Sequence, residues 1–183
     1  MEWPATEARD AGRTGTQPPE DGGGSDQRES RVIVYLDASA LVKRYVAERG
    51  SRETADLCAG ASIVATSLVS RAEVAAALAK AVRVGIVEPD KGRKAQRAFA
   101  GQWPDFAKVP VTEALVARAE ALAWDAALRG YDAVQLASAL TWQESVGAEI
   151  TLATFDRRLW DAGKQVGIHI WPETLRTSRH RRL

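Results

Sequence analysis

The sequence feature that most limits the possible folds is a short apolar run, Val32–Leu36, which is followed directly by Asp37. A continuous run rich in β-branched residues is typical of a strand that is buried on both faces of a parallel sheet. Because parallel strands are joined by crossover connections, usually helices, this run alone favours an α/β fold.

Four further strand candidates alternate with helical patterns along the chain, at residues 61–65, 107–111, 149–153 and 167–170. This alternation predicts one three-layer α/β/α domain with a central, mostly parallel sheet of about five strands. With 183 residues, of which 45% are hydrophobic, the chain has enough apolar material for one core of that size.

The helices between these strands can be placed from their caps and from apolar residues spaced three or four apart. A first helix is expected after a cap at Thr66 or Ser67, with an apolar stripe made of Leu68, Ala72, Ala75, Ala79 and Val82. Thr112 is the expected cap of a second helix, and a third extends from about Tyr131 to Val146. Residues 89–105 contain Gly92 and Pro104, which weakens the helical pattern there.

The two ends of the chain differ in composition from the middle. Residues 1–30 contain three basic and seven acidic residues and almost no periodic apolar pattern, which predicts a disordered N-terminal extension. The folded domain is expected at 31–175, and it is mildly basic because 22 basic and 17 acidic residues remain for 31–183. Residues 176–183 form an arginine-rich tail that either meets a polyanion or is simply solvated.

Several classes of protein are disfavoured by what the sequence lacks. It contains no apolar run long enough to span a bilayer and no secretory signal pattern, so we expect a soluble, cytoplasmic protein with no membrane partner. Cys58 is the single cysteine, and His169 and His180 are the only histidines. These counts argue against a disulfide framework, a zinc site and a Ser-His-Asp triad.

Four acidic residues fall where a parallel sheet would bring them together. Asp37 and Asp156 each follow a strand, so both lie at the carboxyl edge of the sheet, where open α/β sheets bind ligands. Asp132 begins a later helix, and Glu73 is expected about two turns into an earlier one. Clustered carboxylates repel one another and raise one another's pKa unless a cation is bound, and oxygen ligands suit Mg²⁺ or Mn²⁺.

Each acid also has a purely structural interpretation. Asp37 and Asp132 are possible N-caps, Asp156 is a possible cap of a short helix at 157–161, and Glu73 is a possible solvated residue near Lys80. For a single acid the structural interpretation is favoured, whereas the set of four favours a metal site.

Four motifs in the chain resemble, in their order and spacing, those of VapC-type PIN-domain toxins. The first motif spans residues 37–45, and the others are Ser70–Val74, Tyr131–Ala137 and Leu152–Leu159, so that the resemblance covers about 32–172. It implies a ribonuclease toxin that depends on Mg²⁺ or Mn²⁺, acts on RNA, is inhibited by a cognate antitoxin protein and forms a homodimer.

The resemblance also implies which residues carry the activity. The catalytic and metal-binding acids would be Asp37, Glu73, Asp132 and Asp156, with Ser39 and Thr154 supporting them. The latter two are equally well interpreted as turn and helix-start residues. The chain departs from the family pattern in its long N-terminal extension, and a start codon at Val32 or Val34 is a possible explanation.

Positive side chains close to the acids in sequence are the candidates for contact with RNA phosphates, namely Lys43, Arg44, Arg71, Arg157 and Arg158. Trp142 and Trp171 are more often packing residues than base-stacking ones, and we expect packing for both.

The same residues argue against two other classes of protein. A haloacid-dehalogenase-type phosphatase would need a second aspartate where Ser39 stands, and a receiver domain would need paired acids after the first strand. A structure-specific DNA nuclease and a catalytically inactive PIN-like interaction domain remain open as alternatives, and a metal-dependent RNA cleavage assay would separate them.

Overall fold

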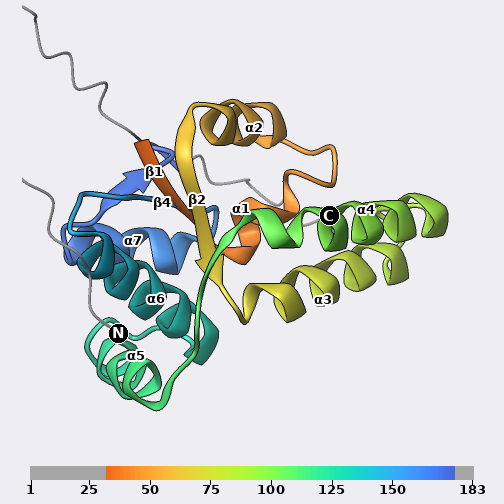
Figure 1. The fold of residues 1–183 in the computed structure, drawn as a ribbon. Coiled ribbons are helices and arrows are strands. Elements are labelled where there is room, and N and C mark those ends of the chain that lie inside the picture. The colour runs from red at the N-terminus through yellow and green to blue at the C-terminus, as the bar shows by residue number, and fades with distance from the viewer. Residues whose placement is uncertain (1–31, 176–183) are drawn as a thin grey trace, which may run out of the picture.

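The computed structural model describes residues 32–175 (Figure 1), so the predictions for the N-terminal extension and for the tail at 176–183 lie outside the described residues. Five strands form one parallel sheet in the order β3-β2-β1-β4-β5. Their bounds are β1 Val32–Leu36, β2 Ala61–Ser67, β3 Ala107–Val109, β4 Thr151–Ala153 and β5 His169–Trp171. The predicted parallel sheet of about five strands is confirmed.

The central strand is β1, which is buried on both faces of the sheet, as its apolar sequence predicts. It pairs with β2 on one side and with β4 on the other, and Val34, Tyr35 and Leu36 are fully buried. Alternate side chains of β1 enter different cores: Tyr35 packs on one side of the sheet, and Val34 and Leu36 pack on the other.

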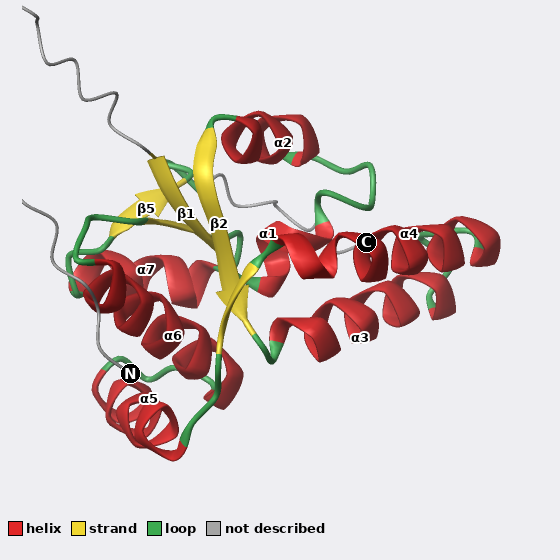
Figure 2. Cartoon of the chain, in the orientation of Figure 1, coloured by secondary structure: helices red, strands yellow, loops and turns green. Residues whose placement is uncertain are grey.

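Helices cover both faces of the sheet, so the fold has three layers (Figures 1 and 2). On one face lie α5 (Glu113–Asp125), α6 (Gly130–Val146) and α7 (Arg157–Gln165), and on the other lie α1 (Ala38–Val42), α3 (Ser70–Arg83) and α4 (Pro89–Gln102). The short α2 (Ser51–Ala59) leads directly into β2, and a 3₁₀ turn at Trp103–Asp105 leads towards β3. In the described part of the chain, no helix is long and apolar enough to cross a membrane.

The expected start of α3 is wrong, and the strand before it explains why. Thr66 and Ser67 still belong to β2, where they pair with β3, so neither residue caps the helix, which begins at Ser70. The buried face of α3 consists of Ser70, Val74 and Leu78. The predicted stripe was displaced from this face, since Leu68 is 46% exposed.

The other helix predictions agree more closely with the structure. Thr112 caps α5 and accepts a hydrogen bond from the backbone N–H of Leu115, and α6 ends at Gly147, whose φ is 62°. Residues Pro89–Gln102 form a continuous α-helix despite Gly92. A Cβ atom at Gly92 would collide with the side chain of Val82, so this glycine permits the close packing of α3 and α4.

Candidate functional site

Asp37 lies at the carboxyl end of β1, at the junction with α1. Its side chain caps α1 by accepting a hydrogen bond from the Ala40 N–H at 2.9 Å. Two hydroxyls also donate to it: Ser39 Oγ lies 2.8 Å from Oδ1, and Thr154 Oγ1 lies 2.9 Å from Oδ2. The carboxylate is therefore both a helix cap and the centre of a fixed hydrogen-bond cluster.

Burial dominates the electrostatics of Asp37, which is 4% exposed. The pKa of this carboxyl is raised to about 7, mainly because the carboxylate is removed from water and to a smaller extent by the charge of Glu73. The hydrogen bonds from Ala40, Ser39 and Thr154 act in the opposite direction and lower the pKa. The group therefore titrates near neutral pH and favours a nearby cation.

Asp156 follows β4 and caps α7, as its structural interpretation predicted. Its Oδ1 accepts hydrogen bonds from the backbone N–H groups of Arg158 and Leu159, at 2.8 and 3.2 Å. The Asp156 N–H donates to Thr154 Oγ1, whose own proton is directed at Asp37. Because β1 and β4 are neighbouring parallel strands, Thr154 connects the two acids at the sheet edge.

Asp132 lies in the first turn of α6, and the N-cap position of that helix is occupied by Arg129. The expectation that Asp132 is an N-cap is therefore wrong. Its Oδ2 is buried and has no hydrogen-bond partner among the described residues. Burial raises the pKa of Asp132, the charge of Asp156 raises it further, and the positive charge of Arg129 opposes the increase.

Glu73 lies in the first turn of α3 and is half-buried. It accepts a hydrogen bond from Gln135 Nε2 on α6 at 2.5 Å, so its partner is not Lys80. Burial raises the pKa of Glu73, the Gln135 hydrogen bond lowers it, and the charge of Asp132 raises it again. The charges of the four predicted acids thus interact in neighbouring pairs. The charge of Glu73 acts on Asp37, that of Asp132 acts on Glu73, and that of Asp156 acts on Asp132.

The donor set fits a hard divalent ion that keeps part of its water shell. All four candidate ligands are carboxylates, and Asp132 Oδ2 is a buried oxygen that lacks a donor in the described part of the chain. Among residues 32–175, no three Asp, Glu, His or Cys side chains form a compact group that would hold an ion directly. An ion bound by one or two carboxylates and by water is the type of coordination that Mg²⁺ prefers.

Gln135 is the main residue of this region that the sequence analysis did not assign to the site. It is buried, and it contacts Tyr35 on β1 and both Ser70 and Glu73 on α3. One signal was available in the sequence, since Gln135 lies three residues after Asp132 and so shares a helix face with it.

The five candidate RNA-binding side chains differ in how they are held. Lys43 pairs with Glu48 at 3.1 Å and also donates to the Arg49 carbonyl. Arg157 pairs with Asp161, Arg44 lies over the Phe106 ring, and Arg71 lies over the Trp103 ring. Arg158 is close enough to Asp132 to lower its pKa. Arg129, which was not predicted, acts on Asp132 in the same direction.

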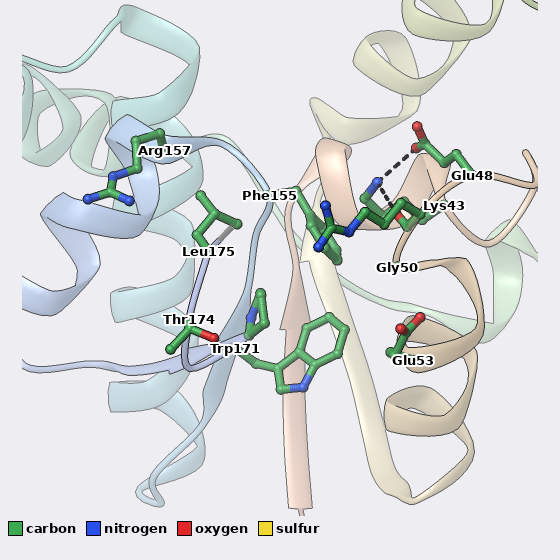
Figure 3. A pocket seen from close by; sticks show the side chains of 11 residues that line it. Lys43, Glu48, Gly50, Glu53, Phe155, Arg157, Trp171, Thr174 and Leu175 are labelled. Carbon is green, nitrogen blue, oxygen red and sulfur yellow. Dashed lines mark hydrogen bonds and ion pairs between the residues drawn. The ribbon is translucent and has the colours of Figure 1, made fainter. Parts of the chain in front are cut away.

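A pocket of about 740 Å³ lies beside the acids, and Figure 3 shows Lys43, Gly50 and Glu53 facing Trp171 and Leu175 across it. Phe155 separates this pocket from the acids, because its ring lines the pocket while its N–H donates to Ser39 Oγ. Trp171 packs edge-on against Phe155 and also lines the pocket, and Trp142 packs against the core beneath α6, so packing is observed for both tryptophans.

Comparison with known proteins agrees with this geometry. The PIN domain family model matches residues 34–165, and the chain belongs to that family. Within the family its relatives are of the VapC type: it is 36% identical to ribonucleases VapC45 and VapC49 of Mycobacterium tuberculosis. Each alignment spans 144 residues, which is 78% of this chain and 97% of the relative.

Solved structures support the same fold. PAE2754 from Pyrobaculum aerophilum superposes with a TM-score of 0.52 at 22% identity, covering 84% of this chain and 92% of its own. VapBC2 from Rickettsia felis, solved with a DNA fragment from its promoter, gives a TM-score of 0.53 at 12% identity, covering 76% and 97%. At these identities the likeness establishes the fold alone.

Proposed function

We propose that this chain is the ribonuclease toxin of a type II toxin-antitoxin pair and that it hydrolyses RNA phosphodiester bonds with Mg²⁺ or Mn²⁺. The observation that carries the proposal is the convergence of Asp37, Glu73, Asp132 and Asp156 in a chain that aligns with nearly the full length of two named ribonucleases. These four carboxylates are the proposed catalytic and metal-binding residues.

In this proposal a bound divalent ion supplies positive charge opposite the phosphate and acidifies the attacking water. The protein contributes fixed ligands. Ser39 and Thr154 donate to both oxygens of Asp37, so the carboxylate cannot rotate away from the site. Asp132 offers a buried oxygen with no competing donor in the described structure. Glu73 completes the ligand set or orients the attacking water.

Charge on the reacting phosphate also requires cations from the protein. Arg129 and Arg158 act on the same carboxylate, Asp132, and therefore flank the acids. Together with Lys43, Arg44, Arg71 and Arg157, they are the proposed phosphate-binding side chains. In-line hydrolysis leaves a 5′-phosphate and does not use the ribose 2′-hydroxyl, so the acids themselves do not select RNA over DNA. The choice of RNA rests on the named relatives.

Two protein partners belong to the proposal. A cognate antitoxin is expected because one solved structural neighbour is described as a toxin-antitoxin complex from Klebsiella pneumoniae. A homodimer is expected from the resemblance to the VapC type. Co-purification with the product of a short neighbouring reading frame would test the first partner, and sedimentation of the isolated chain would test the second.

The decisive experiment is cleavage of single-stranded RNA by the purified full chain with Mg²⁺, with Mn²⁺ and with EDTA. Asp37→Asn should abolish cleavage, whereas Asp125→Asn is the matched control, since Asp125 is exposed at the end of α5. Single-stranded and duplex DNA serve as competing substrates. Preference for DNA would favour the DNA-nuclease alternative, and absence of cleavage under all conditions would favour an inactive interaction domain.

A further inference from the structure

We propose that Gln135 is a positioning residue that fixes the Glu73 carboxylate within the acidic site. The inference rests on the proposed function, because Glu73 is one of its four acids. It assigns a role to a buried amide that otherwise has no part in the chemistry. Gln135 is 2% exposed and lies on α6, one turn after Asp132.

All of the hydrogen-bonding capacity of the Gln135 side chain that the structure shows is directed at three groups. Tyr35 donates its hydroxyl proton to Gln135 Oε1 at 2.7 Å. Gln135 Nε2 donates to Ser70 Oγ at 2.8 Å and to Glu73 Oε2 at 2.5 Å. The two groups that it contacts on α3 are one turn apart, so a single amide holds the first turn of that helix.

The chemistry of the partners fixes which end of the amide faces Glu73. An ionised carboxylate only accepts hydrogen bonds, so it must face the NH₂ group. Oε1 then faces Tyr35, which must keep its proton in order to donate it. Burial raises the pKa of Tyr35, so its hydroxyl stays protonated. The reversed amide would place two acceptors in contact, and the network therefore has one arrangement.

The same network extends to the backbone next to Asp37. Ser70 Oγ is hydrogen-bonded to Thr66 Oγ1 at 2.8 Å, and Thr66 donates to the Leu36 carbonyl at 2.7 Å. Leu36 is the last residue of β1, immediately before Asp37. The support of Glu73 and the strand that carries Asp37 are thus parts of one buried set of hydrogen bonds, which fixes the spacing of two acids from different elements.

Among the hydrogen bonds of the described residues, Gln135 is the side-chain donor to the Glu73 carboxylate. Loss of this donor would leave a half-buried glutamate free to change rotamer while its neighbours Asp37 and Asp132 repel it. Groups that orient metal ligands typically alter metal affinity by about 10- to 100-fold when they are removed. A change in Mg²⁺ affinity is therefore the expected signature.

The test compares Gln135→Leu with Gln143→Leu in the full chain. Gln143 lies two turns further along α6, and its Oε1 contacts the Ile150 N–H, so it gives the same substitution away from the acids. Melting temperature is measured against Mg²⁺ concentration, and cleavage of RNA is measured over the same range. Gln135→Leu should raise the half-saturating Mg²⁺ concentration about tenfold or more in both assays. Excess Mg²⁺ should restore cleavage with the KM for RNA unchanged.

Tyr35→Phe removes the hydroxyl that orients the amide. It should shift the Mg²⁺ dependence in the same direction as Gln135→Leu, by a smaller factor. This variant decides the matter if Gln135→Leu does not fold. Equal Mg²⁺ dependence of parent, Tyr35→Phe and any folded Gln135→Leu, with a parent that cleaves RNA, would overturn the positioning role and leave the proposed function standing. A parent that neither cleaves RNA nor gains thermal stability from Mg²⁺ would instead overturn the proposed function and this inference with it.

Discussion

The four acids lie in two regions of the molecule, the strand ends and the helices, and their carboxylates have different hydrogen-bond partners in the two regions. At the strand ends, Asp37 and Asp156 cap α1 and α7 and accept hydrogen bonds from backbone N–H groups of those helices. On the helices, Asp132 has a buried oxygen with no donor in the described structure, and Glu73 is held by one side-chain amide. The carboxylates of the first pair cap helices, whereas those of the second pair do not.

This difference separates folding from function. A carboxylate that accepts backbone hydrogen bonds as a helix cap has a structural role. The presence of an acidic residue at such a position is therefore weak evidence of a catalytic role. A half-buried carboxylate that has repelling neighbours and does not cap a helix lowers stability, and a bound cation would compensate for it. The helix acids are therefore the more informative half of the site.

Among substitutions of the helix acids, the largest expected effect is the loss of RNA cleavage in Asp132→Asn. Loss of this ligand should reduce cleavage by about a thousandfold or more, since a divalent ion contributes several kcal/mol to the transition state. In EDTA the free energy of unfolding of the variant should equal or exceed that of the parent. The substitution replaces a carboxylate, whose charge is disfavoured by burial, with a neutral amide. RNA cleavage and urea denaturation measure the two quantities. Asp125→Asn, at the exposed end of α5, is the control.

A loss of metal-free stability in Asp132→Asn would contradict the comparison, since it would show that Asp132 supports the fold as the capping carboxylate of Asp156 does. Survival of cleavage in the same variant would remove Asp132 from the proposed ligand set.

The next largest effect is the dependence of metal-free stability on pH. The pKa of Asp37 is about 7 in the folded protein and about 4 when unfolded, so between these values the folded state binds more protons. The contribution of Asp37 to the free energy of unfolding should therefore be highest below pH 4 to 5, and it should fall as pH rises towards 7. The size is on the order of 4 kcal/mol for a shift of about three units.

Asp37→Asn should lose this part of the pH dependence, so its metal-free stability should exceed that of the parent at pH 8 and fall below it, or match it, at pH 5. Urea denaturation in EDTA at the two pH values decides the matter. Parallel pH profiles for the two proteins would show that Asp37 does not titrate in this range. Burial is the main cause of the raised pKa of Asp37, and repulsion by Glu73 is a smaller one. From the sequence, mutual repulsion among the acids was the expected cause of raised pKa values.

The same comparison explains how far the sequence could predict the site. Asp37 and Asp156 follow strands, and strand ends are visible in the apolar pattern, so their positions could be inferred directly. Glu73 and Asp132 could be assigned only to helices that follow or precede these strands, because their approach depends on how α3 and α6 pack. The start of α3 was missed because Thr66 and Ser67 resemble caps in sequence, although pairing with β3 keeps them in β2. Gln135 gave little signal, since its partner Tyr35 is 100 residues away in the chain.

The smallest effect concerns Asp156, where the structural and chemical roles coincide and two substitutions can separate them. Asp156→Ala removes the cap of α7 and should reduce the free energy of unfolding by about 1 kcal/mol, whereas Asp156→Asn keeps a capping oxygen and should change it by a few tenths at most. Both variants remove the charge, so both should weaken cleavage to the same extent if Asp156 is a metal ligand. Thermal melts and RNA cleavage with Mg²⁺ provide the two measurements. Cleavage that falls in the alanine variant alone would show that Asp156 acts only as the cap of α7, and the metal site would then depend on the three remaining acids.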